Sequence, residues 1–100
     1  GQGSIHAVVG MLKDKDISAT LAALTPLVSH WYPATLAGPR GADGSELSAL
    51  LNHAAYFESV IAALTAALAA RAEGERVVVF GSFFTVAEAL AWHRTQQKEL

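Results

Sequence analysis

The chain has 100 residues, a length suited to one domain, and a formal net charge of −2 with 16% charged residues. This balance excludes the basic surface by which proteins bind nucleic acid. The chain has no cysteine, which excludes disulfides and thiolate nucleophiles and fits a reducing cytoplasm. No apolar run approaches the roughly 20 residues that span a bilayer. We therefore expect one cytoplasmic domain over residues 1–100 that binds neither nucleic acid nor membranes.

The first part of the chain predicts a strand, a helix and a second strand. Residues 5–11 form a short β-branched apolar run that is typical of a buried strand. Asp16 stands where an N-cap belongs, ahead of apolar residues at helical spacing. Pro26 lies inside that spacing, so the helix should kink or end near Leu24. Residues 30–37 are the next extended segment.

The remaining chain predicts two helices, a third strand and a closing helix. Residues 38–45 are rich in turn formers, and Ser45 is a possible cap for a short helix. The strongest helical pattern covers residues 56–74, and residues 76–82 form the best strand. Such alternation predicts an α/β fold, a Rossmann-like three-layer arrangement of a parallel sheet with flanking helices. Three strands are fewer than the ~5–6 of an average sheet.

Three loops are predicted to face a ligand, because open parallel sheets bind ligands beyond the carboxyl ends of their strands. The first loop, residues 11–16, carries Lys13, Asp14, Lys15 and Asp16. The second carries Arg40 between a proline and a glycine, and a guanidinium suits carboxylates and phosphates. The third, residues 81–85, opens a helix, whose first N–H groups also suit an anion.

Each of these signals has a simpler interpretation. Ser82 and Thr85 favour helix N-termini and could act only as caps. Residues 13–16 could be a solvated loop that supplies one cap. Ser82 is a poor nucleophile, because Phe84 stands where a nucleophile elbow needs its second glycine. The four histidines show no metal-ligand spacing, and the chain has no phosphate-binding glycine loop or catalytic triad, so it does not look like a complete enzyme.

The segments "VVGMLKDKDI", "LAGPRGA" and "VVVFGSFFTVAEAL" together resemble the C-terminal domain of the bifunctional folylpolyglutamate synthase/dihydrofolate synthase family. That family belongs to the Mur ligase superfamily. The resemblance implies part of a two-domain ATP-dependent ligase that activates a carboxylate as an acyl phosphate. The ligase then joins L-glutamate to dihydropteroate or to a reduced folate. ATP and Mg²⁺ would be bound mainly by an N-terminal ATPase domain, so we expect the 100-residue chain alone to be inactive.

The resemblance also assigns roles to single residues. Ser82, Arg40 and Phe84 would lie at the substrate, with Ser82 donating a hydrogen bond to glutamate or the acyl intermediate. Lys13, Asp14, Lys15 and Asp16 would line the cleft between the two domains. Family members carry an Asp-x-Ala-His-Asn-Pro stretch before the strand that matches residues 5–11, and this chain has none. We therefore expect the sheet to lack its first strand and helix.

Two alternatives remain open. The chain could belong to another Mur-type ligase, one that adds amino acids to a cell-wall precursor. Phe83 and Phe84 argue against this, because cell-wall enzymes usually carry a Gly-Lys-Gly-His type of element there. The chain could also be a non-catalytic α/β binding or interaction module. A P-loop encoded upstream would favour the ligase.

Overall fold

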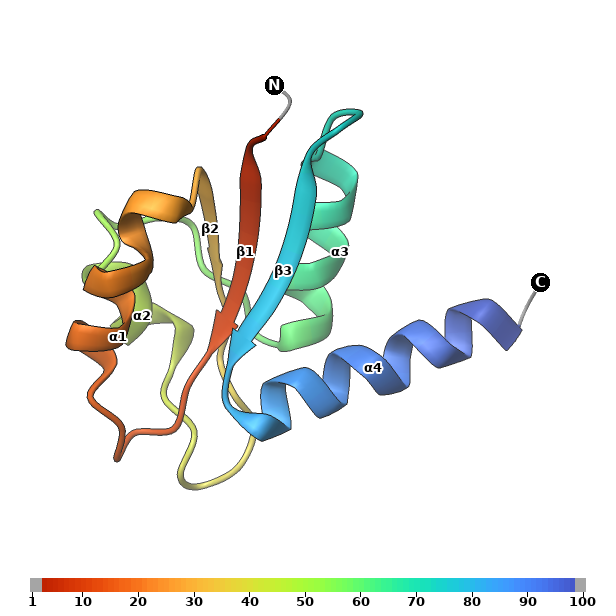
Figure 1. The fold of residues 1–100 in the computed structure, drawn as a ribbon. Coiled ribbons are helices and arrows are strands. Elements are labelled where there is room, and N and C mark those ends of the chain that lie inside the picture. The colour runs from red at the N-terminus through yellow and green to blue at the C-terminus, as the bar shows by residue number, and fades with distance from the viewer. Residues whose placement is uncertain (1–2, 99–100) are drawn as a thin grey trace.

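The structure is a computed structural model that describes residues 3–98. It is a three-stranded sheet between two layers of helices (Figure 1). The elements in chain order are β1 (Ile5–Gly10), α1 (Ile17–Leu24), a 3₁₀ turn η1 (Thr25–Leu27), β2 (His30–Pro33), α2 (Gly44–Ala49), α3 (Val60–Ala70), β3 (Arg76–Gly81) and α4 (Phe83–Lys98).

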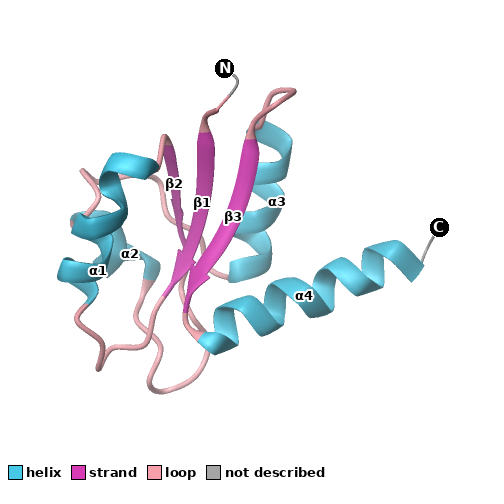
Figure 2. Cartoon of the chain, in the orientation of Figure 1, coloured by secondary structure: helices cyan, strands magenta, loops and turns pink. Residues whose placement is uncertain are grey.

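The three strands are parallel and lie in the order β2-β1-β3, with β1 in the centre (Figure 2). In the register, His6 is paired with His30 on one side and with Val77 on the other. Ala7, Val8 and Val9 of β1 are fully buried, as expected for a central parallel strand. The β-α-β unit and the parallel sheet predicted from the sequence are therefore confirmed.

The core has two parts, one on each face of the sheet, because neighbouring side chains of a strand point to opposite faces. Val8 packs with α3 and α4, and Leu64 and Ala89 lie in that cluster. Val9 packs with α1 and α2, which contribute Leu21 and Leu47. Helices therefore pack against both faces of β1, and the strand holds the start of the loop that follows it in a fixed position.

Local signals set the limits of α1 as predicted. The carboxylate of Asp16 accepts a hydrogen bond from the Ala19 N–H at 3.2 Å, which makes it the N-cap. The helix ends at Leu24, and Pro26 falls within the 3₁₀ turn that follows. A proline cannot donate the next helical hydrogen bond, which accounts for this end.

Three predicted boundaries were wrong. The extended segment at residues 30–37 is a strand only as far as Pro33. Ser45 is not a cap, because α2 already begins at Gly44 and its N-cap position is Asp43. The helix predicted over residues 56–74 is limited to Val60–Ala70.

The late start of α3 has a long-range cause. The Phe57 N–H donates to the Pro33 carbonyl, and the Phe57 carbonyl accepts from the Thr35 N–H, both at 2.9 Å. Phe57 is therefore extended beside the end of β2, and the helix begins only after Ser59, whose hydroxyl caps it. The spacing of apolar residues along the chain does not show that Phe57 pairs with the end of β2 instead of joining the helix.

Candidate functional site

The three predicted loops all lie at the carboxyl end of the sheet, the lower end in Figure 1. Two of them are joined directly by backbone hydrogen bonds. The Lys13 N–H donates to the Arg40 carbonyl, and the Ala42 N–H donates to the Met11 carbonyl, both at 2.8 Å. The loop after β1 and the loop that carries Arg40 thus form one surface.

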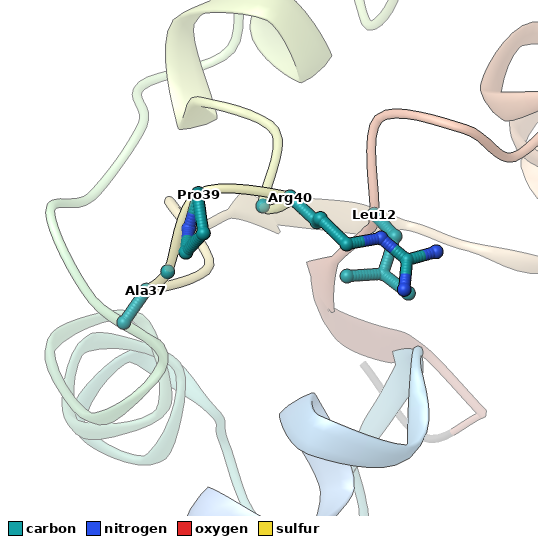
Figure 3. Close-up of a pocket in the computed structure, with 6 residues that line it drawn as sticks. Leu12, Ala37, Pro39 and Arg40 are labelled. Carbon is teal, nitrogen blue, oxygen red and sulfur yellow. The ribbon is translucent and has the colours of Figure 1, made fainter.

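A shallow pocket of about 260 Å³ lies between these two loops and is lined by Leu12, Ala37, Gly38, Pro39, Arg40 and Gly41 (Figure 3). In this view the Arg40 side chain extends toward Leu12, away from Ala37. The backbone is tight at Gly41, where a Cβ would lie 1.9 Å from the Leu36 carbonyl oxygen. Only glycine permits this path, which sets the position of Arg40.

Arg40 forms an ion pair with Asp14 across the two loops, and both side chains are more than half exposed. The hydrogen bond from Arg40 holds the pKa of the Asp14 carboxyl below its ordinary value. Solvent-exposed ion pairs are worth at most about 1 kcal/mol. A carboxylate or phosphate of a ligand can therefore compete with Asp14 for this guanidinium.

The third loop joins β3 to α4 and is held against the end of β1. Gly81 has φ of +127°, and a Cβ there would lie 2.0 Å from the Gly10 carbonyl oxygen. The Ser82 hydroxyl accepts the Thr85 N–H at 3.1 Å, so Ser82 caps α4. The fully buried Thr85 hydroxyl donates to the Gly10 carbonyl at 2.7 Å. These bonds tie the third loop to the strand from which the first loop starts.

The predicted site residues are only partly connected. The structure links Arg40 to Asp14 by side chains and to Lys13 by backbone. Asp16 faces α1 as its N-cap, and the Lys15 N–H closes a turn on the Leu12 carbonyl at 3.3 Å. The cap interpretation of Ser82 is confirmed, and its contact with a substrate stays a prediction. The side chain of Phe84 lies outside the described part of the structure.

Sequence reasoning missed a polar cluster at the opposite end of the sheet. The ring of His6 is hydrogen-bonded to the Tyr32 hydroxyl at 2.8 Å and to the Glu75 carboxylate at 2.7 Å. Hydrogen bonds, of which that from the Ala72 N–H has the largest effect and that from His6 a smaller one, lower the pKa of the Glu75 carboxyl to about 2. The cluster joins β1 to β2 and to the residue that precedes β3, so His6 has a structural role.

Within residues 3–98, no group of three or more His, Asp or Glu side chains could hold a metal ion. None of the helices in this part of the chain is both long and apolar enough to cross a membrane. The site at the carboxyl end of the sheet therefore offers a cation, a helix N-terminus and backbone groups for anionic ligands, but no metal-binding set of its own.

Comparison with known proteins identifies the fold and its family. The family model described as "Mur ligase, glutamate ligase domain" matches residues 1–83. This chain is a member of that family. The chain is 47% identical, over 88 residues, to the dihydrofolate synthase/folylpolyglutamate synthase of Escherichia coli K12. This alignment takes in 88% of the chain but 21% of the E. coli protein.

Solved structures agree with this assignment. The E. coli FolC structure in complex with DHPP and ADP matches 97% of the present chain and 23% of its own, with a TM-score of 0.92 and 42% identity. A bifunctional folylpolyglutamate synthase/dihydrofolate synthase with Mn, AMPPNP and L-glutamate bound matches 92% of the present chain and 23% of its own. Its TM-score is 0.89 and its identity 44%. The present chain thus spans less than a quarter of the length of these relatives.

Proposed function

We propose that this glutamate ligase domain forms the amino-acid side of an ATP-dependent ligase that joins L-glutamate to dihydropteroate or to a reduced folate. The observation that carries the proposal is the hydrogen-bonded surface at the carboxyl end of the sheet, where Arg40 and the start of α4 are held by glycine-dependent turns. Its support is a sequence identity above 40% to enzymes crystallised with nucleotide, with DHPP and with L-glutamate.

The proposed reaction has two steps. The acceptor carboxylate attacks the γ-phosphorus of ATP, which forms an acyl phosphate and releases ADP. The amine of L-glutamate then attacks the carbonyl carbon, the bond from that carbon to the phosphate oxygen breaks, and inorganic phosphate leaves. The amine loses a proton as the amide forms. Mg²⁺ would neutralise charge on the ATP phosphates, bound by an N-terminal ATPase domain of the same protein.

The residues of this chain would bind and orient rather than transfer protons. Arg40 would attract a carboxylate of glutamate, in competition with its partner Asp14. Ser82 and the N-terminus of α4 would lie beside the incoming amino acid, and Phe84 would contact the substrate. The loop after β1 would face the cleft between the domains with Lys13, Asp14, Lys15 and Asp16. Holding the amine close to the carbonyl carbon of the acyl phosphate, in the orientation for attack, is a recognised source of rate enhancement.

The proposal makes residues 1–100 a C-terminal domain that is inactive alone, within a cytoplasmic enzyme that needs neither nucleic acid nor membrane. The test is phosphate release by the longer protein with ATP and Mg²⁺, with L-glutamate and dihydropteroate added separately and together. Release that needs both supports the proposal, and Arg40→Ala should then raise the KM for L-glutamate. If reduced folates also fail as acceptors, the folate assignment is wrong. A cell-wall precursor or a non-catalytic module would then be the next hypothesis.

A further inference from the structure

The face of β3 that turns away from α3 and α4 carries an apolar groove. The side chains of Val77 and Val79 pack with α3 and α4. Those of Val78 and Phe80 point to the other face, because successive side chains of a strand alternate. The groove on that face has a volume of about 330 Å³, and its lining is entirely apolar: Ile5, Leu24, Leu27, Val28, Val78 and Phe80.

This groove is open to solvent in the described part of the chain. Leu27 is 64% exposed and Val78, inside a strand, is 38% exposed. The strand β3 pairs with β1 on one side, and no strand within residues 3–98 pairs with its other edge (Figure 1). An exposed apolar groove beside a free sheet edge is typical of a surface that another element covers.

The chain enters β1 through the same kind of turn by which it enters β3. Gly74 has φ of +84° and stands two residues before Arg76, where β3 begins. Gly3 has φ of +88° and stands two residues before Ile5, where β1 begins. Ile5 and Arg76 are paired in the sheet, so the two turns lie at the same level. The turn at Gly74 follows the end of α3, and a glycine of positive φ commonly follows a helix.

We propose that the groove binds an amphipathic helix of the same protein, formed by the segment directly before residue 1. The chain spans less than a quarter of its relatives, which leaves ample length for such a segment. The groove reaches Ile5, so the helix passes into β1 by the short turn at Gly3. The sequence-based expectation of a missing strand and helix gives neither a position. The inference does not depend on the proposed ligase reaction.

The handedness of parallel connections selects the same face. The helices α1 and α3 lie on opposite faces, as right-handed connections require when the chain moves from β1 to β2 and then back to β3. A connection from the free edge of β3 to β1 crosses the sheet in the direction of β1 to β2, so its helix lies on the face of α1. That helix ends at the amino end of the strands, where Arg76 shares a face with Val78. A cation there stabilises the carboxyl end of a helix.

Thiol labelling of the full-length protein tests the docking. Residues 1–100 contain no cysteine, so one thiol introduced here reports on its own site. Val78→Cys lies in the groove and Leu68→Cys lies on α3, and both native side chains are 38% exposed. We expect Val78→Cys to react with a maleimide at least about tenfold more slowly, because a docked helix must open before the thiol reacts. Mass spectrometry of the two labelled peptides gives the rates.

A second groove position keeps the test valid if Val78→Cys does not fold. Leu27→Cys should be protected in the same way. A second thiol moved along the preceding segment should form an intramolecular disulfide with the groove thiol at every third or fourth position. Groove thiols that react as fast as Leu68→Cys would overturn the proposal. Protection that is lost on dilution, or a disulfide between two chains, would assign the groove to a second copy and also overturn it. None of these readouts requires ligase activity.

Discussion

Replacing Gly81 by alanine should break the contact between the ends of β1 and β3. Gly81 has φ of +127°, a conformation that L-residues with a Cβ rarely adopt. In addition, the new Cβ would lie 2.0 Å from the Gly10 carbonyl oxygen and 3.2 Å from the Gly10 nitrogen. These atoms belong to the central strand and cannot move without disturbing the paired register of Gly10 with Gly81.

The cost can be worked from these two effects. A residue with a Cβ in this backbone region costs roughly 1–3 kcal/mol. Displacing a packed neighbour costs roughly another 1–3 kcal/mol. The expected loss is therefore roughly 2–6 kcal/mol, against a total stability of about 5–15 kcal/mol for a domain of this size. The melting temperature should fall by about 8 °C or more, since 1 kcal/mol corresponds to about 4–8 °C.

Gly38 provides a matched control, because its φ is +102° and a Cβ there meets nothing within 4 Å. Gly38→Ala should show only the backbone cost, so its loss should be smaller by roughly 1–3 kcal/mol. Urea unfolding of both variants, followed by circular dichroism, measures the difference. Equal midpoints and slopes for the two variants would refute the close approach of Gly81 to Gly10.

Three further predictions follow from single contacts. The pKa of Glu75 lies below its ordinary value of 4.5, at about 2, because of several hydrogen bonds, of which that from the Ala72 N–H has the largest effect and that from His6 a smaller one. Its stabilisation should be complete above about pH 4.5 and be lost as the pH falls toward 2, so the unfolding midpoint of Glu75→Gln should vary less over that range. Asp16→Ala removes a cap and should lower the urea-unfolding free energy by about 1 kcal/mol, whereas Asp16→Asn should lose much less. Arg40→Ala breaks only an exposed ion pair, so thermal unfolding should show a loss below about 1 kcal/mol, and a larger loss would mean that Arg40 supports the fold.

Much of the fold could be predicted because its strands and helix ends carry local signals. The β-branched apolar runs predicted the positions of β1 and β3 in the chain. Asp16 predicted where α1 begins, and Pro26 predicted where it ends. The predicted parallel sheet also placed the three candidate loops together at the carboxyl end of the sheet, where they are found. Where prediction failed, a distant partner was responsible, as when Phe57 pairs with the end of β2 instead of joining α3.

The chemistry of the site could be predicted only in outline. The sequence suggests Thr85 as a possible cap, but its hydroxyl partner is Gly10, 75 positions away. The Glu75 carboxylate likewise meets His6 across 69 positions. No periodicity or motif encodes such contacts, since they depend on which strand ends the fold brings together. Arg40 was identified because an arginine between proline and glycine is unusual, and its partner Asp14 was identified only by the structure.

The most direct test of the account is to look for the amide product itself. The full-length protein is incubated with ATP, Mg²⁺, L-glutamate and dihydropteroate, and the products are separated and identified by mass spectrometry. The account predicts dihydropteroate that carries one added glutamyl residue, with one ADP and one phosphate formed for each product molecule. ATP hydrolysis without any glutamylated product, from dihydropteroate or from reduced folates, would contradict it.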